Sequence, residues 1–139
     1  MIELALQRDD LIEALRTDAS GIGGGWFLDT ESGSVLLASD AIEGLPEDIE
    51  DNPRYLAIDP ISSHESFGFM EDFVTELGDS KEAHRLAEAL NRPKPFRQFR
   101  DTLCDYPSLR EAWFTYEQAA YNQLAEEWCE DNGIKVIWA

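Results

Sequence analysis

The sequence predicts an α+β fold: a small antiparallel sheet, made of an N-terminal hairpin plus two further strands, with four to five helices packed against it. Three observations favour this class. Two β-rich runs flank a turn that ends in glycine, several apolar runs have helical spacing, and a β-branched run closes the chain. With 139 residues, no internal repeat and no long linker, residues 1–139 are predicted to form a single domain.

The predicted strands are short and are bounded by turn residues. They span residues 26–29, 34–38, 54–58 and 134–138. The glycine-rich run at 21–25 lacks the lysine and the strand-before, helix-after context of a phosphate-binding loop. It is therefore interpreted as a flexible turn into the hairpin. The acidic stretch at 43–53 is interpreted as an exposed loop, because runs of charge are usually solvated.

Five helices are predicted from apolar residues that recur every three or four positions. Each begins at a residue that suits a helix N-terminus, and these are Asp9, Ser62, Ser80, Pro95 and Ser108. Ser62 with Glu65 and Ser108 with Glu111 have the spacing of capping boxes. The last helix is the longest, and it is expected to end at Asn132-Gly133.

The net charge of −18 comes from 29 acidic against 11 basic residues. Such acidity excludes a general nucleic-acid binder, which needs clustered Lys and Arg. The charge is uneven, because residues 1–80 hold 19 acids against three arginines whereas 81–110 hold seven basic residues against four acids. The chain lacks an apolar run of about 18 residues and the basic lead of a signal peptide. We therefore expect a cytoplasmic location and no membrane partner.

The basic stretch supplies the candidate site for an anion or a partner, which consists of Arg92, Lys94, Arg97, Arg100 and Arg110. Phe96, Phe99 and Leu103 share one face of the predicted helix. Arg97 and Arg100 therefore project elsewhere and lie next to each other. Neighbouring guanidinium groups bind phosphate or carboxylate in bidentate geometry. The simpler alternative is that these arginines pair with the chain's own carboxylates.

Other side chains carry weaker signals. Phe114 and Tyr121 lie away from the core stripe of the last helix and are a possible aromatic contact for a partner, with packing against the first helix or the sheet as the alternative. Cys104 and Cys129 lack metal-type spacing and are predicted to be reduced, buried packing residues. The carboxylates at 47–51 lack the order of a calcium loop, so neither a metal nor a cofactor is predicted.

Several short segments together resemble a bacterial family catalogued as uncharacterised protein family 0158. They are Trp26-Phe27-Leu28-Asp29 with Gly33, Arg54-Tyr55-Leu56-Ala57-Ile58, Met70-Glu71-Asp72-Phe73, the stretch from Ala89-Leu90 to Phe96-Arg97-Gln98-Phe99-Arg100, and Arg110-Glu111-Ala112-Trp113-Phe114. The resemblance covers residues 26–128. It implies a single α+β domain and brings no established activity, substrate or cofactor.

These observations predict a small acidic cytoplasmic binding or regulatory module that recognises a protein partner through its uneven charge. The alternative is an enzyme that acts on a phosphorylated or carboxylated small molecule through the arginine patch. A deep pocket holding Arg97 and Arg100 would favour the enzyme. Nucleic-acid mimicry by the acidic half and limited single-strand binding through Phe and Arg are further hypotheses, the second disfavoured by the net charge.

Overall fold

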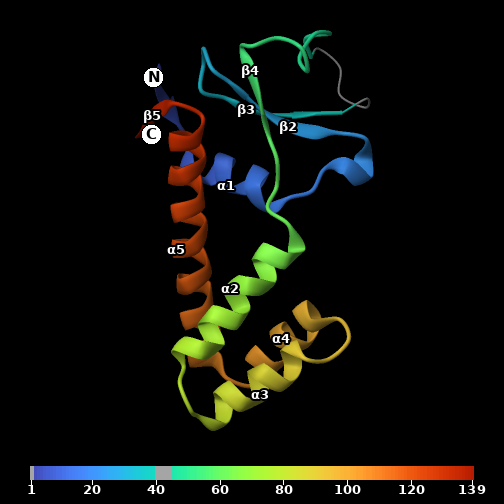
Figure 1. The fold of residues 1–139 in the computed structure, drawn as a ribbon, viewed down its shortest axis with the longest axis vertical. Coiled ribbons are helices and arrows are strands. Elements are labelled where there is room, and N and C mark those ends of the chain that lie inside the picture. Colours follow the sequence, from blue (N-terminus) through green and yellow to red (C-terminus); the bar gives the residue numbers. More distant parts are fainter. Residues whose placement is uncertain (1, 40–44) are drawn as a thin grey trace. The chain divides into compact units, whose positions relative to one another are not determined.

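The computed structural model describes residues 2–39 and 45–139, which form two compact units (Figure 1). In chain order the elements are β1 (Ile2–Leu6), α1 (Arg8–Arg16), the 3-10 turn η1 (Ser20–Ile22), β2 (Gly25–Asp29), β3 (Val35–Ala38), β4 (Tyr55–Ile58), α2 (Ser63–Glu76), α3 (Lys81–Leu90), α4 (Pro95–Leu103), α5 (Pro107–Asp131) and β5 (Ile134–Trp138). We call residues 1–61 with 121–139 the sheet unit and residues 62–120 the helical unit. The prediction of a single domain is not tested by this division and stays a prediction.

The predicted hairpin is confirmed. Strands β2 and β3 pair antiparallel, and β4 pairs antiparallel with the other side of β2, so the order in this sheet is β3-β2-β4. The hairpin turn needs Gly33, whose φ is +78° and at which a Cβ would collide with the carbonyl oxygen of Ala5. The turn therefore lies directly against β1.

The prediction of one antiparallel sheet is wrong for the closing strand. β5 forms as predicted, but it pairs parallel with β1, from Ile2 opposite Ile134 to Leu6 opposite Trp138, in a separate two-stranded sheet. β1 was not predicted, because the segment is short and is followed at once by the charged residues that open α1. Its alternation is that of a strand, since Leu4 and Leu6 are buried whereas Glu3 and Ala5 are exposed.

In the sheet unit, α1 buries the apolar face formed by Leu11, Ala14 and Leu15 and packs against β3. The guanidinium of Arg8, at the start of α1, lies 4.8 Å from the ring centroid of Trp138 on β5. Helix α1 therefore contacts strands of both sheets.

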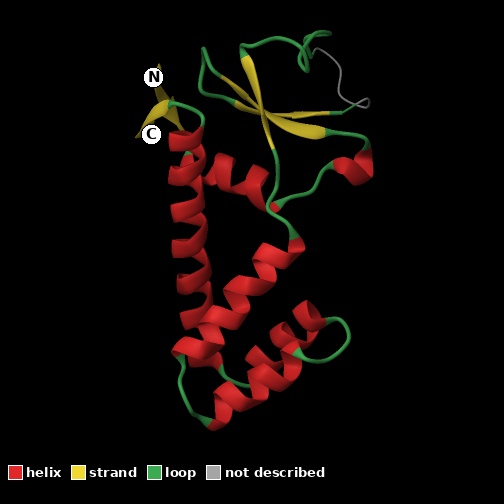
Figure 2. Cartoon of the chain, viewed as in Figure 1, coloured by secondary structure: helices red, strands yellow, loops and turns green. Residues whose placement is uncertain are grey.

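The helical unit has a core of its own, built from helices (Figure 2). Its buried residues are Met70, Phe73, Leu86, Leu90, Phe99, Leu103 and Trp113. Ser62 and Ser80 cap α2 and α3 as predicted, each accepting a backbone N–H at 3.1 Å. α5 begins at Pro107, so Ser108 lies inside its first turn and the predicted capping box there is wrong.

A helix that spans a membrane must be both long and apolar. No helix in residues 2–39 and 45–139 meets both of these requirements.

Candidate functional site

Four of the predicted basic residues lie on α4 and on the turn before it, and we call Arg92, Lys94, Arg97 and Arg100 the basic surface. Phe99 and Leu103 of α4 are each 1% exposed in the core of the helical unit. Burial of that face leaves Arg97 and Arg100 exposed, as the spacing of the apolar residues predicts.

The turn that carries Arg92 and Lys94 is conformationally restricted. Pro93 and Pro95 each fix their own φ, and Pro95 occupies the first turn of α4. Lys94 between them has φ +57°, in the left-handed region that non-glycine residues seldom adopt. Its side chain makes no capping hydrogen bond, and this cationic residue is the N-cap of a helix whose N-terminal partial charge is also positive.

Few carboxylates of the described residues pair with the basic surface. Only Arg97 has an acidic neighbour among the described residues, with Nε 3.9 Å from the Asp101 carboxylate, and both side chains are well exposed. Such a pair contributes little. Within the same described residues, the side chains of Arg92, Lys94 and Arg100 make no hydrogen bond or ion pair. Among the described residues, the alternative that the chain's own carboxylates pair with these side chains therefore applies to Arg97 only.

Arg85 of α3 shows what a neutralised arginine looks like in the same unit. It donates to the hydroxyl of Tyr106 at 2.7 Å and to the carboxylate of Asp105 at 3.1 Å. These two hydrogen bonds, the one to Tyr106 first, raise the pKa of its guanidinium. Arg85 is thus bound internally, whereas the basic surface is not.

Arg110, the fifth predicted residue, is on α5 rather than on α4. Its guanidinium lies 5.4 Å from the ring centroid of Phe114, and within the described part of the chain its side chain makes no hydrogen bond or ion pair. Phe114 is 50% exposed, whereas Tyr121 is 5% exposed beneath the guanidinium of Arg16 on α1, at 4.7 Å. The two aromatic rings therefore do not form an exposed pair, and Tyr121 packs against the first helix.

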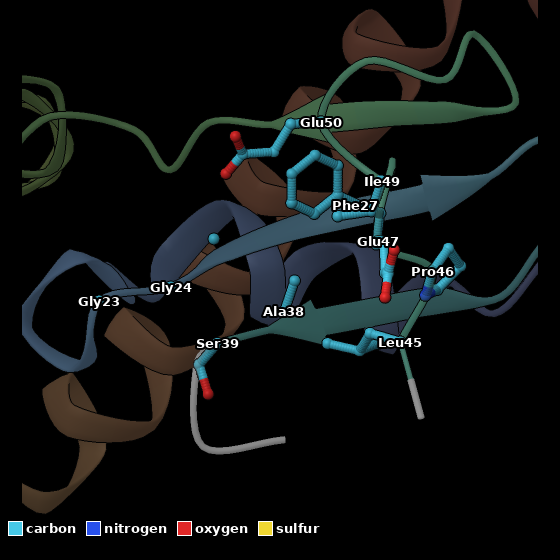
Figure 3. A pocket seen from close by; sticks show the side chains of 11 residues that line it. Gly23, Gly24, Phe27, Ala38, Ser39, Leu45, Pro46, Glu47, Ile49 and Glu50 are labelled. Atoms are coloured by element: carbon cyan, nitrogen blue, oxygen red, sulfur yellow. The ribbon is translucent and has the colours of Figure 1, made fainter. Parts of the chain in front are cut away.

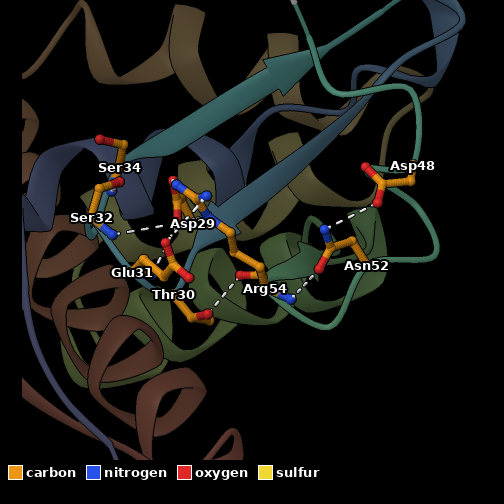
Figure 4. Close-up of polar contacts among 8 residues, drawn as sticks. All are labelled: Asp29, Thr30, Glu31, Ser32, Ser34, Asp48, Asn52 and Arg54. Atoms are coloured by element: carbon orange, nitrogen blue, oxygen red, sulfur yellow. Dashed lines mark hydrogen bonds and ion pairs between the residues drawn. The ribbon is translucent and has the colours of Figure 1, made fainter.

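The sheet unit contains a polar network that the sequence did not reveal (Figure 4). Asp29 is 7% exposed and is the one buried charged residue of the described chain. Arg54 donates two hydrogen bonds to the Asp29 carboxylate, from Nε to Oδ1 at 3.0 Å and from Nη2 to Oδ2 at 2.9 Å. Oδ1 also accepts the backbone N–H groups of Glu31 and Ser32. Chiefly through the Arg54 bonds, the pKa of Asp29 lies well below its usual range.

This network fastens the hairpin turn to the start of β4. The hydroxyl of Thr30 donates to the carbonyl of Arg54 at 2.7 Å, and the side chain of Asn52 accepts the Arg54 N–H at 2.9 Å. Because both charges are satisfied within the protein, the pair stabilises the sheet unit and offers little to a ligand. One feature of the sequence could have indicated that Arg54 pairs with a nearby carboxylate: it is the only Lys or Arg between positions 17 and 80.

A pocket of about 450 Å³ adjoins the glycine run (Figure 3). Gly24 passes so close to β3 that a Cβ would collide with the carbonyl oxygen of Ala38, so the run is a tight turn. Phe27 and Ile49 supply apolar lining, and Glu47 and Glu50 supply carboxylates. A phosphate would meet like charge here.

The acidic stretch is only partly exposed. Glu43 and Gly44 lie outside the described residues, and Glu47, Asp48, Glu50 and Asp51 are exposed. Ile49, however, is buried against Phe27 and Ala38, which corrects the interpretation of this stretch as a wholly exposed loop. Among residues 2–39 and 45–139, His, Cys, Asp and Glu side chains form no group of three that suits a metal ion.

Comparison with known sequences covers the whole chain. The model of the uncharacterised protein family UPF0158 matches residues 1–139. The chain belongs to this family. It is similar to UPF0158 protein PA5073 of Pseudomonas aeruginosa, with 37% identity over 138 residues that cover 97% of this chain and 88% of that protein. No solved structure matches the chain. The family resemblance seen in the short segments is thus confirmed.

The two cysteines of this UPF0158 chain differ in environment. Cys129 on α5 is fully buried, as predicted, and burial raises the pKa of its thiol to about 11, with a smaller contribution from Glu126. Cys104, just after α4, is exposed, so the prediction that it is a buried packing residue is wrong. It is the C-cap residue of α4 and directly follows the apolar face that ends at Leu103.

Proposed function

We propose that this UPF0158 protein is a small binding module of the cytoplasm that recognises an acidic segment of a protein partner through the basic surface. The observation that carries the proposal is that Arg92, Lys94 and Arg100 are exposed and have no partner in the described chain, although the sequence holds 29 acidic residues. Like charges gathered on one turn and one helix repel each other. A partner's carboxylates would relieve that repulsion and accept bidentate bonds from the guanidinium groups.

A protein segment suits this surface better than a small molecule does. Ligand pockets are concave and bury most of a small ligand. The three pockets described in the structure are lined by residues of the sheet unit, and neither Arg97 nor Arg100 lines any of the three. The alternative of an enzyme acting through the arginine patch therefore has no supporting observation, and we do not propose it.

The proposal is tested with a fluorescein-labelled oligoglutamate peptide, whose binding is followed by fluorescence anisotropy. Reversing two charges of the basic surface in R97E/R100E is expected to weaken binding roughly ten-fold or more at low salt. The matched control is K81E/K135E, which has the same net charge but alters exposed lysines outside the basic surface. Wild-type binding should weaken steeply between about 50 mM and about 300 mM NaCl, since exposed charges are screened.

The control decides how the result is interpreted. Equal loss in both double variants would mean that only net charge matters and would contradict the proposal. Absence of peptide binding by the wild type at low salt would contradict it as well. Displacement of the peptide by inorganic phosphate at low millimolar concentration would instead favour a small-anion site. Far-UV circular dichroism verifies that each variant is folded.

A further inference from the structure

The two-stranded sheet leaves one strand edge open. Ile2 donates its N–H to the Gly133 carbonyl at 3.0 Å, and Ala139 donates to the Leu6 carbonyl at 2.8 Å. In a parallel pair, every second residue of a strand directs its backbone N–H and C=O toward the partner strand. These two bonds therefore imply that Lys135 and Ile137 also direct their backbone groups toward β1. The N–H and C=O groups of Ile134, Val136 and Trp138 therefore point to the opposite side of β5. No described strand pairs with them there.

The other edge of this sheet is covered. Glu3 and Ala5 direct their backbone groups away from β5, by the same alternation. The Gly33 turn lies against the Ala5 carbonyl oxygen so closely that no Cβ fits there. An added strand is therefore excluded beside β1, and β5 carries the edge that no described strand pairs with.

A groove of about 370 Å³ adjoins β5 on the side of α5. Its apolar lining includes Cys129, Val136 and Trp138, and Trp138 is held by the Arg8 guanidinium stacked on its ring. Side chains of an added strand would alternate between this groove and the outward face of the sheet. On that outward face Ile137 is 49% exposed, so further apolar contact is available.

Charge determines which occupant fits. Glu126 and Glu130 of α5 line the groove, and the only basic residue in its lining, Lys135, lies opposite Glu3 in the strand register. The sheet unit as a whole has 18 acidic and four basic residues. A second copy of the chain would bring its own Glu126 and Glu130 toward the same place and meet repulsion. A basic segment would instead be attracted by the carboxylates of Glu126 and Glu130.

We propose that β5 accepts an extended, basic segment of a partner protein as a third strand, with apolar side chains in the groove and lysines or arginines beside Glu126 and Glu130. This site is independent of the basic surface. It lies in the other unit, binds the opposite charge, and depends on none of the four residues proposed above.

The test uses the peptide acetyl-Thr-Lys-Thr-Val-Thr-Lys-Thr-amide, whose valine and two lysines share the face that would meet the groove, and amide hydrogen exchange by NMR. In the free protein, Val136 and Trp138 should exchange faster than Ile137 and Ala139, whose N–H groups face β1. The peptide should slow Val136 and Trp138 by roughly ten-fold or more and leave Ile137 and Ala139 nearly unchanged. Such alternate-residue protection is specific to strand addition, and unselective protection along β5 would overturn the proposal.

V136P and E126Q/E130Q, each with a matched control, separate the contribution of the backbone hydrogen bond to peptide affinity from the contribution of charge. V136P removes an N–H that faces the open edge while sparing the bonds to β1, and V136T keeps that N–H. Peptide affinity should fall about ten-fold in V136P and little in V136T. E126Q/E130Q should weaken binding several-fold at low salt, whereas the control E127Q/D131N, which changes neighbouring α5 residues outside the groove lining, should not.

Other outcomes overturn the proposal. Equally tight binding of the same peptide with glutamate in place of both lysines would remove the charge argument. Slow exchange at Val136 and Trp138 in the free protein, together with a dimer in sedimentation, would identify a second copy as the occupant. Peptide binding that neither V136P nor E126Q/E130Q weakens would place the peptide away from β5.

Discussion

The two units treat their basic residues differently. The sheet unit holds 18 acidic and four basic residues, and three of its basic side chains are held by other groups: Arg54 by Asp29, Arg8 on Trp138 and Arg16 on Tyr121. The helical unit holds 11 acidic and seven basic residues, yet Arg92, Lys94 and Arg100 have no described partner. An excess of carboxylates therefore does not by itself neutralise an arginine. Whether an arginine finds an internal partner depends on its position in the fold.

The largest effect is expected where the helical unit derives its stability. Phe99 packs edge-on against Trp113, with ring centroids 5.1 Å apart, and F99A should lower the free energy of unfolding by about 3–5 kcal/mol. F114A is the control, because Phe114 is half exposed, and it should cost less than about 1 kcal/mol. Urea unfolding followed by circular dichroism measures both. Equal losses would mean that this core does not hold the unit together.

The sheet unit should depend instead on its buried carboxylate. D29A removes the acceptor of two Arg54 bonds and two backbone N–H bonds, and it should cost about 2–3 kcal/mol. D101A is the matched control in the helical unit, where the one side-chain partner among the described residues is Arg97 at 3.9 Å, and a change below about 0.5 kcal/mol is expected. Comparable losses in the two variants would erase the contrast between the units.

Acid should weaken the sheet unit through the same group. The folded pKa of Asp29 is depressed, so its stabilising contribution is complete above the unfolded pKa of about 4 and is lost as pH falls further toward the folded value. D29N has no charge to titrate, and its free energy of unfolding should decrease less than that of the wild type below about pH 4. Parallel pH profiles for the two proteins would show that Asp29 is not perturbed.

Much of this structure follows from local patterns, and the remainder depends on distant partners. Caps such as Ser62 and Ser80, and the spacing of Phe96 and Phe99, act within one helix, so the helices and the exposure of Arg97 were predictable. β1 was not, because it gains its bonds only from β5 at the other end of the chain.

The state of each arginine also depends on distant residues. Asp29 and Arg54 are 25 residues apart, and Arg85 and Asp105 are 20 apart. No local spacing indicates such pairs. The sequence therefore predicted where positive charge gathers but not which arginines would find a carboxylate.

The comparison between internally paired and unpaired arginines is tested most directly by removing one arginine of each kind, and these two substitutions have the smallest expected effects on the free energy of unfolding. R54Q should cost about 1–2 kcal/mol, because it leaves the buried Asp29 carboxylate with backbone donors only. R100Q should change the free energy of unfolding by less than about 0.5 kcal/mol, because Arg100 has no described partner to lose, and it relieves repulsion from the rest of the basic surface. Both variants lose one positive charge, so a general effect of net charge cancels. If R100Q destabilised the protein as much as R54Q, Arg100 would have a structural role, and its availability to a partner would no longer follow from its exposure.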